Sequence, residues 1–416
     1  MHDSGQSWLG SIPSTWGLSR IGSLYSLRNE KVSDKDYPPL SVTMKGVVPQ
    51  LDSAAKSDDG DNRKLVMAGD FAINSRSDRR GSCGISAYNG SVSLINTVLT
   101  PRDEMHPGYY NWLFHTVAFA DEFYKWGHGI VDDLWTTRWQ EMKRIIVPVP
   151  LMEEQQAIAA YLDDQVAQID SIIAEAQASI EEYKQWKASV IFEALTKGLD
   201  ATIAMRRSSH PGIGMIPAHW KQAKVKQVAQ INPSCPAGNL MPDDEVTFAP
   251  MECIRADRRL PKTAPLASNN SSYSSFLEGD IALAKVTPCF QNSNVCIMEN
   301  LVNRYAFGSS ELFNIRPTSI NSRFLLYYFM TEAFKDGGVA SMTGVAGLQR
   351  VSSTYVRNAV LPYPNAEEQA EIVKYLDVKC KVIDGIMEEK ESLIADLESY
   401  KRSLIYEAVT GKRKVV

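Results

Sequence analysis

The 416 residues are 44% hydrophobic and carry a formal net charge of −5. One hydrophobic core rarely serves a chain of this length, so we expect two or three folded domains. No run of about 18 apolar residues is present, and residues 1–10 lack the basic start and apolar centre of a signal peptide, which argues against a membrane protein and predicts a cytoplasmic one. The six cysteines include no CxxC pair, and no zinc-finger spacing occurs, so we expect free, mostly buried thiols.

The first globular module is predicted over residues 1–150 as a mixed α+β domain. It opens with Ile-Pro-Ser-Thr-Trp at 12–16, and Gly69-Asp70 precedes an apolar strand at 71–73. A helix is expected late in the module, over 109–123. Short strands followed by a late helix are typical of an α+β domain.

A long helix is predicted over 151–198. Its apolar residues recur at alternating steps of three and four from Leu162 to Val190, which is the pattern of a coiled-coil seam with a polar interruption at Lys187. At 1.5 Å per residue, 35 uninterrupted residues span about 50 Å. We expect such a helix to act as a spacer between domains.

The same order of landmarks then returns. After a linker at 199–212, a second module is predicted over 213–363 and a second spacer helix over 364–411, with a late module helix at 324–334. Ile-Pro-Ala-His-Trp at 216–220, a second Gly-Asp and a second Pro-x-Pro before Glu-Glu-Gln repeat the motifs of the first half. Over 148–196 against 362–410, 20 of 49 aligned positions are identical, where composition predicts roughly 3. The chain is therefore a tandem duplication of a domain plus a helix.

The duplicated helices allow two arrangements. Each helix could lie only on its own module as an amphipathic helix. Two matching seams in one chain favour pairing of the helices with one another instead. Lys187 and Lys401 occupy equivalent seam positions, and Lys390 replaces Ala176. Trp186, matched by Tyr400, could anchor a partner protein on the helices.

No catalytic site is predicted. The sequence lacks the Asn/Asp-Pro-Pro-Tyr/Phe pocket of adenine methyltransferases, a GxGxxG cofactor loop and a GxxxxGK[ST] phosphate loop. His128, with Asp132 and Asp133 nearby, is interpreted as part of a polar loop, because its counterpart at 343–350 has no histidine or carboxylate. Glycines in both loops allow close approach to a ligand, and we interpret them as DNA-facing.

The candidate DNA contacts are basic and polar side chains at loops of both modules. Arginine suits both phosphate binding and bidentate reading of guanine. An ordinary solvated turn is the alternative for each of them. In module one they are Arg76, Arg79, Arg80 and His128, and in module two Lys285, Thr287, Gln291, Asn292, Arg304, Gln349 and Arg350.

The duplicated order of Ile-Pro-x-x-Trp, Gly-Asp, Pro-x-Pro with Glu-Glu-Gln, and the helix ends at 192–196 and 406–412 resembles the specificity subunits of type I restriction-modification systems. The resemblance covers essentially the whole chain. It implies two α+β target-recognition domains separated by a pair of long antiparallel coiled-coil helices with pseudo-two-fold symmetry. Each domain would read one half of a split double-stranded DNA sequence.

The resemblance also implies partners. Two modification subunits would dock on the helices and methylate adenine from S-adenosylmethionine, and restriction subunits would use ATP and Mg. This chain would then hold no cofactor and no metal of its own. The net acidity remains unfavourable for binding DNA alone, unless positive charge is segregated or a partner supplies part of the surface.

Two other functions remain open. A coiled-coil scaffold that binds proteins without reading DNA is consistent with the net acidity. A self-sufficient enzyme is disfavoured by the missing catalytic motifs.

Overall fold

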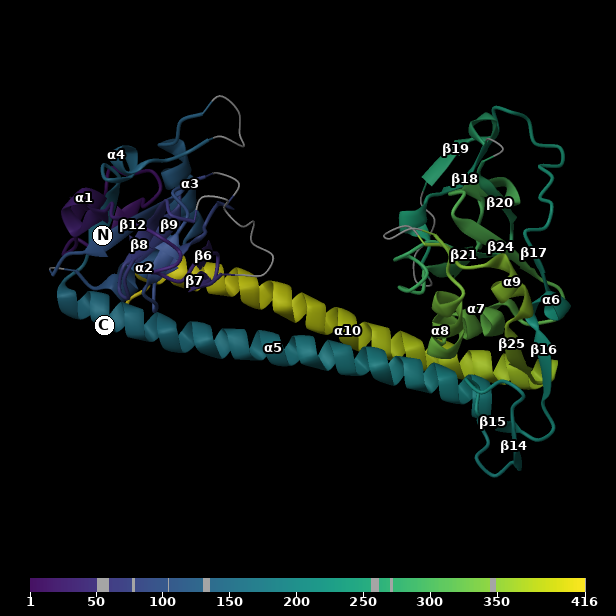
Figure 1. The fold of residues 1–416 in the computed structure, drawn as a ribbon. Coiled ribbons are helices and arrows are strands. Elements are labelled where there is room, and N and C mark those ends of the chain that lie inside the picture. Colours follow the sequence, from purple (N-terminus) through teal and green to yellow (C-terminus); the bar gives the residue numbers. More distant parts are fainter. Residues whose placement is uncertain are drawn as a thin grey trace. The chain divides into compact units, whose positions relative to one another are not determined.

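The computed structural model describes residues 1–415 except 51–59, 77–78, 104, 130–134, 256–261, 270–271 and 345–348. The chain forms two compact units: Met1–Gln177 with Glu391–Val416, and Ala178–Lys390. Two long helices, α5 and α10, each contribute one part to each unit (Figure 1). None of the helices in the described ranges is both long and apolar enough to cross a bilayer.

Unit one is a module of short strands and helices resting on the two long helices. Its main sheet has the order β10-β9-β12-β4, and a second sheet has the order β11-β8-β5. The elements are β1 His2–Asp3, β2 Ser11–Ile12, β3 Gly17–Arg20, α1 Ile21–Leu24, β4 Tyr25–Arg28, β5 Lys31–Val32, β6 Leu40–Thr43, β7 Gly46–Pro49, β8 Arg63–Val66, β9 Phe71–Asn74, β10 Cys83–Ile85, β11 Gly90–Val92, β12 Asn96–Pro101, α2 Pro107–Phe114, α3 Val117–Lys125, α4 Trp139–Met142, β13 Ile146–Val149 and α5 Met152–Lys197.

Unit two repeats this plan with a larger second sheet. Its main sheet has the order β17-β24-β21-β22, and the second has the order β19-β18-β23-β20. The elements are β14 Met205–Arg207, β15 Met215–Pro217, β16 Lys221–Lys224, α6 Val225–Val228, β17 Ala229–Ile231, β18 Glu245–Ala249, β19 Lys262–Pro265, β20 Ser274–Leu277, β21 Ile281–Ala284, β22 Val295–Ile297, β23 Tyr305–Gly308, β24 Leu312–Pro317, α7 Ser322–Met330, α8 Glu332–Ala340, α9 Ser353–Asn358, β25 Val360–Tyr363 and α10 Ala366–Val409.

The main sheets of the two units share one topology. Strand β9 corresponds to β21 and strand β12 to β24, and all residues of β9 and β21 are buried. A strand covered on both faces needs a continuous apolar run rather than alternation, which explains the apolar segments after the two Gly-Asp motifs. The second sheets differ, since β18 pairs with β23 in parallel and the β11-β8-β5 sheet is wholly antiparallel. The duplication therefore preserves one sheet and varies the other.

The late helix predicted in each module is two helices. Helix α2 ends before α3 begins at Val117, and α7 ends before α8 begins at Glu332. Thr116 and Thr331 have extended backbones, and their side chains accept hydrogen bonds from the amides of Phe119 and Phe334. A threonine in this position caps a new helix rather than continuing the old one. The predictions over 109–123 and 324–334 were wrong at these residues.

The segment between α5 and the second module also has structure of its own. Residues 199–212, expected as a linker, include β14, which pairs with β15 as β1 pairs with β2. Each module thus begins with a two-stranded hairpin whose second strand includes the isoleucine of its Ile-Pro-x-x-Trp motif.

The predicted seam is confirmed in both long helices. Every seam position from Leu162 to Val190 and from Leu376 to Leu404 is buried or half-buried. Lys390 Nζ lies 5.9 Å from the centre of the Tyr183 ring, which explains how a lysine is accommodated at this position. The helices pair with one another inside each unit.

Two ion pairs fix how the helices face each other. Lys187 Nζ lies 2.7 Å from Asp384 Oδ1 in one unit, and Lys401 Nζ lies 2.6 Å from Asp170 Oδ1 in the other. Lys187 is the repeat equivalent of Lys401, and Asp170 is the equivalent of Asp384. Asp170 comes before Lys187 along α5, and their partners come in the reverse order along α10, since Lys401 follows Asp384. The two helices are therefore antiparallel. The contact is isologous, because each repeat gives the same lysine and the same aspartate.

The repeated motifs lie where each module meets the helix that follows it. The Trp16 indole donates to Glu154 of α5, and the Trp220 indole donates to Glu368 of α10, at 3.3 and 3.0 Å. These are the tryptophan of Ile-Pro-x-x-Trp and the second glutamate of Glu-Glu-Gln. The motifs therefore encode the joint between module and helix.

The glutamine of the same motif is buried in both repeats. Gln369 Oε1 accepts a hydrogen bond from the Asn321 amide before α7, and its Nε2 donates to the Pro364 carbonyl, both at 2.9 Å. Gln155 makes the same two contacts with His106 and Pro150. One side chain thus ties the start of a module helix to the start of a long helix.

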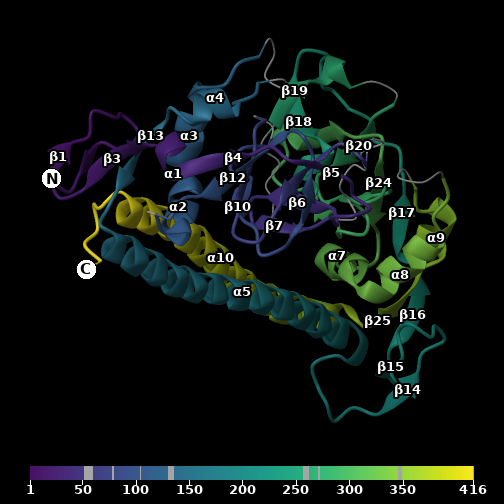
Figure 2. The same ribbon diagram turned by 60° about the vertical axis from the view of Figure 1, so that its left-hand side comes forward.

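Each module also packs on the C-terminal end of the long helix that belongs to the other repeat. The core of unit one includes Leu404 and Val409 of α10, and the core of unit two includes Ile191 and Leu195 of α5. Helix α2 lies against α5 and α10 in both views (Figures 1 and 2), and the Tyr109 hydroxyl donates to the Val409 carbonyl at 2.7 Å. The arrangement in which each helix serves only its own module is wrong.

Gln369→Ala tests this joint. Removing the amide leaves the Asn321 N–H and the Pro364 carbonyl buried without partners, so we expect the free energy of unfolding of the full chain to fall by about 2 kcal/mol. Urea unfolding followed by circular dichroism measures it. The neighbouring exposed Glu367→Ala should change stability by less than about 0.5 kcal/mol. Equal unfolding midpoints for the two variants would contradict this role of Gln369.

Candidate nucleic-acid interface

The predicted DNA contacts of module one gather around Thr136. Arg76, just after β9, forms an isolated antiparallel bridge with Thr136. His128, after α3, pairs with the same residue through two backbone hydrogen bonds of 3.0 Å. The amide of Arg79 donates to the Arg76 carbonyl at 3.3 Å, and the side chains of Arg76, Arg79 and His128 are exposed. Loops far apart in the sequence thus present these side chains together.

Arg80 joins the same cluster through α3. Its guanidinium forms an ion pair with Asp121 and lies 5.8 Å from the centre of the Tyr124 ring. The Tyr124 ring stacks on Trp135 with centres 5.8 Å apart. The guanidinium is therefore held by a carboxylate and an aromatic face, and half of its side chain remains exposed. The other polar residues of these loops, Ser77, Asp78, Asp132 and Asp133, lie outside the described residues.

Module two has the same backbone frame, by which we mean a residue just after a main-sheet strand and a residue after a module helix that both bridge one residue of a later loop. The residues that form it differ. Val286, just after β21, and Thr343, after α8, both bridge Arg350. Arg350 thus holds the place that Thr136 holds in module one. The two positions are 214 residues apart, which is the offset of the repeated helices. The backbone frame is repeated, and the side chains that it presents are not.

Three of the predicted contacts of module two meet at this frame. The amide of Thr287 donates to the Gln349 carbonyl at 3.0 Å, and the amide of Gln349 donates to the Thr287 hydroxyl at 3.2 Å. The Arg350 guanidinium forms two hydrogen bonds with Glu311, at 2.8 and 2.7 Å. That bonding raises the pKa of Arg350 and lowers the pKa of Glu311.

Lys285, Gln291 and Asn292 lie in the segment that leaves β21. Lys285 Nζ donates to the Ser310 carbonyl at 2.6 Å and lies 5.2 Å from the centre of the Phe313 ring. Burial lowers the pKa of this lysine. Gln291 and Asn292 are exposed. Lys285 is thus already engaged with the protein, whereas the two amide side chains face solvent.

Arg304 is separated from the other candidates. It precedes β23, and its carbonyl accepts a hydrogen bond from the amide of Glu278, which lies before β21. Lys285 follows β21, so the strand separates the two side chains. The sequence grouped them because both come after the second Gly-Asp motif.

Sequence reasoning missed the acidic and aromatic partners of the cluster. Asp121 and Glu311 pair with Arg80 and Arg350, and each comes from a segment that the sequence did not connect to these loops. Trp135, which stacks on Tyr124, was not among the predicted contacts. The equivalence of Thr136 and Arg350 had a signal in the sequence, because the helix offset of 214 extends upstream to this pair.

The structure offers no obvious catalytic constellation in the part of the chain that it describes. No three metal-binding side chains come together there. His128 Nε2 lies 4.0 Å from Glu141 Oε1, and the histidine side chain is largely exposed. The exposed charges and amides of these loops suit binding to a charged surface that offers hydrogen-bond partners.

Trp186 and Tyr400 occupy equivalent positions on α5 and α10. Their side chains are 48% and 47% exposed, which is unusual for large aromatic residues on a paired helix. Each unit therefore carries one member of this equivalent pair, and α10 exposes a further aromatic residue, Tyr375, in unit two.

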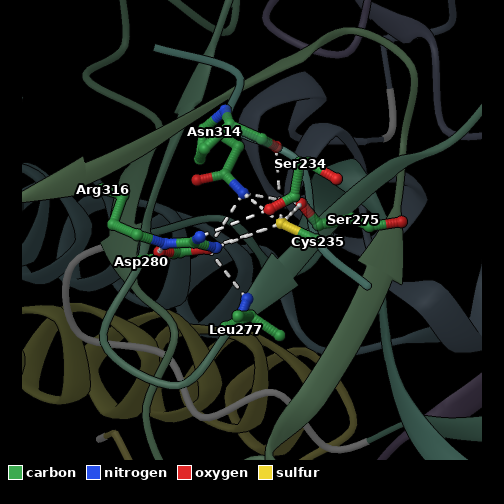
Figure 3. Close-up of polar contacts among 8 residues, drawn as sticks. Ser234, Cys235, Ser275, Leu277, Asp280, Asn314 and Arg316 are labelled. Carbon is green, nitrogen blue, oxygen red and sulfur yellow. Dashed lines mark hydrogen bonds and ion pairs between the residues drawn. The ribbon is translucent and has the colours of Figure 1, made fainter. Parts of the chain in front are cut away.

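A buried ion pair fixes the start of the strand that leads to each candidate loop. In unit two, Asp280 accepts two hydrogen bonds of 2.7 Å from Arg316 and one of 2.9 Å from Asn314 (Figure 3). These hydrogen bonds raise the pKa of Arg316. Cys235 Sγ lies 3.1 Å from Arg316 Nη2, and burial raises the pKa of this thiol, opposed by the guanidinium. All six cysteines are free, and four are buried.

Unit one makes the same ion pair from a different strand. Asp70 accepts hydrogen bonds from Arg28 at 2.6 and 3.1 Å and from the Thr100 hydroxyl at 3.0 Å. Arg28 lies on β4, whereas Arg316 lies on β24, the counterpart of β12. Thr100 occupies on β12 the place of Arg316 on β24. The arginine has moved to the neighbouring strand, and the buried aspartate is satisfied in both units.

Comparison with known proteins gives a consistent set of relatives. The specificity subunit of the type I restriction enzyme EcoEI from Escherichia coli is 33% identical over 166 residues, covering 38% of this chain and 27% of that protein. The MjaVIII specificity subunit of Methanocaldococcus jannaschii is 23% identical over 438 residues, covering 97% and 94%. No family model matches the chain.

The chain is a homologue of type I restriction enzyme specificity subunits. The match spans only about a quarter of the length of the EcoEI protein. Two solved structures share the fold. A chain from a study of assembly and conformational transition of the type I R-M system has a TM-score of 0.72, with 14% identity and coverage of 96% and 98%. The HsdS subunit of Thermoanaerobacter tengcongensis has a TM-score of 0.53, with 16% identity and coverage of 97% and 98%.

Arg28→Ala tests the buried pair in this specificity-subunit homologue. It leaves Asp70, 2% exposed, without its ionic partner, so we expect a loss of about 3 kcal/mol in the stability of unit one. The double variant Arg28→Asn with Thr100→Arg copies the arrangement of unit two and should recover much of that loss. Urea unfolding of the three chains measures it. The exposed Arg20→Ala is the control, and a loss as large there would contradict the pairing.

Proposed function

We propose that this chain is the non-catalytic DNA-specificity subunit of a type I restriction-modification complex. The observation that carries the proposal is the repeated frame, in which Thr136 and Arg350 hold equivalent loops that present different side chains. A protein that reads a split sequence needs this combination. Equivalent backbone frames let the two modules dock on the duplex with related orientations, and different side chains on these frames read different bases. Relatives that carry the name of specificity subunit support it.

The domains of this proposal follow the duplication. Residues 1–150 and 213–363 are target-recognition domains, each contacting one half of a bipartite double-stranded target. Residues 151–198 and 364–411 form the spacer helices, and 199–212 join the halves. The paired helices set the spacing between half-sites. Arg80 and Arg350 already pair with Asp121 and Glu311, so exchange of these carboxylates for phosphate is the binding step.

Partner subunits complete the proposed complex. Two modification subunits dock on the helices at Trp186 and Tyr400 and methylate adenine from S-adenosylmethionine, after the base is flipped into their pocket. Restriction subunits supply ATP- and Mg-dependent cleavage. The complex acts on DNA in the cytoplasm. This chain supplies recognition and spacing and contributes no cofactor.

Replacing Arg76, Arg79 and Arg80 with alanine tests the interface in module one. In the complex assembled with the modification subunits, we expect weaker binding to a duplex that carries the target. The slope of log affinity against log salt should fall by about 0.9 for each phosphate that the variant no longer neutralises. Fluorescence anisotropy over a salt series measures both quantities.

The same three positions changed to lysine provide the matched control. Lysine keeps the charge but cannot form the bidentate contact that arginine makes with guanine. Retained salt slope with relaxed sequence preference would assign base reading to these arginines. Unchanged affinity and sequence preference in the alanine variant would overturn their role.

Lengthening the spacer tests the helices. Seven residues inserted after Ala178 and seven after Ser392, at equivalent repeat positions, add about 10 Å to each helix. At 3.4 Å per base pair, we expect about three more unread base pairs between half-sites. Methylome sequencing of cells carrying the complex measures the spacing. Methylated sites with unchanged spacing would contradict the proposal that the helices set the distance between half-sites. Replacement of seven residues in each helix without insertion is the control.

A further inference from the structure

The hairpins that open the two modules share two equivalent backbone hydrogen bonds. The amide of Ser4 donates to the Gly10 carbonyl at 3.1 Å, and the amide of Ser208 donates to the Gly214 carbonyl at 2.8 Å. The next bonds, Leu9 to Gln6 and Ile213 to His210, are both 3.1 Å. This register makes Gly212 the counterpart of Trp8.

Trp8 fills a space between the hairpin and the helices in unit one. Its side chain is 7% exposed, and its ring lies edge-on to Phe119 of α3 with centres 5.9 Å apart. Its carbonyl accepts a hydrogen bond from the Tyr406 hydroxyl of α10 at 3.1 Å. A cleft of about 260 Å³ remains beside α3 and α10.

The corresponding place in unit two is an open cleft of about 830 Å³. Its wall includes Gly212, Ala188 of α5 and Gly337 of α8, where unit one has Trp8, Arg402 and Glu122. Phe192 lines the same cleft. Unit two thus has three small residues where unit one has three large side chains. The space that the Trp8 indole fills in unit one is open in unit two.

The cleft has an acidic edge on α8. Glu332 and Asp336 are exposed there, and Val117 stands in unit one where unit two has Glu332. Lys184, on the α5 side, is engaged by Glu181 at 2.6 Å. Glu332 Oε1 lies 2.7 Å from Lys335 Nζ, so a basic group beside an aromatic one would meet the carboxylate of Asp336 and compete with Lys335 for that of Glu332.

We propose that this cleft binds an aromatic side chain of a partner protein, an indole above all, presented next to a basic residue. The occupant is indicated by the chain itself, because the equivalent space in unit one already holds the indole of Trp8. Buried aromatic anchors in preformed pockets are the usual centres of protein interfaces. This site lies within unit two and does not depend on DNA recognition.

The probe is the peptide Ac-Lys-Trp-Lys-NH2 made with 5-fluorotryptophan, added to the full chain and followed by fluorine NMR. We expect its signal to shift and broaden with the wild-type chain. The peptides Ac-Lys-Ala-Lys-NH2, labelled with fluorine at its acetyl group, and Ac-Glu-Trp-Glu-NH2, with the same fluorotryptophan, should bind at least tenfold more weakly. Equal binding of the acidic peptide would overturn the charge argument, and no binding of the first peptide would overturn the site.

Gly212→Trp is the decisive variant, because it places an indole where unit one has Trp8. The backbone of Gly212 is not in the left-handed region, and an added Cβ would lie 3.5 Å from His210 and 3.6 Å from Ala333, which are ordinary contacts. Peptide binding should be abolished with an unchanged circular dichroism spectrum. Gly212→Ala keeps the cleft open and should bind as the wild type does.

The remaining variants separate the possible outcomes. Glu332→Gln with Asp336→Asn should weaken the lysine-flanked peptide by about threefold or more. Binding that persists in Gly212→Trp would overturn the cleft as the site. Binding of free 5-fluoroindole without any binding of the peptide would show a small-molecule pocket and overturn the protein partner.

Discussion

The two ion pairs between α5 and α10 determine how this chain is organised. A seam of apolar residues alone lets two helices slide or reverse, because neighbouring apolar positions are nearly interchangeable. Lys187 and Lys401 interrupt the seam, and each pairs with the aspartate of the other repeat. Partly exposed ion pairs contribute little stability. Their contribution here is specificity of register, since any shift would leave two lysines in the seam without partners.

That register explains why the repeated motifs cluster at the joints. Trp16 and Trp220 contact the first turn of a long helix, and Gln155 and Gln369 lie in that turn and contact the module, so all four fix each module against the pair. The second sheets and the candidate loops are free of this constraint and have diverged. The buried aspartates show how divergence proceeds without loss of stability: the arginine changed strand, and the charge stayed compensated. A rigid frame with replaceable loops is what the proposed recognition of different sequences requires.

The sequence predicted the long helices, their pairing and the two-module plan, because helical periodicity and internal repetition are local properties. It failed where distant segments decide the outcome. Thr116 and Thr331 lie in helix-compatible sequence, and their capping depends on the chain turning at those residues. The grouping of Arg304 with Lys285 followed chain order, although β21 lies between them. Asp121 and Glu311 could not be assigned as partners of the arginines, because nothing in their own sequence context points to the loops they meet.

The packing of α10 on the first module has a consequence for synthesis. Leu404, Ile405, Ala408 and Val409 belong to the core of unit one, and they are synthesised only after the whole second module. The first module therefore emerges with an apolar surface that its own half cannot cover. The first module can complete its core only after α10 has been synthesised, so a nascent chain that still lacks α10 exposes this surface and is vulnerable to aggregation and proteolysis.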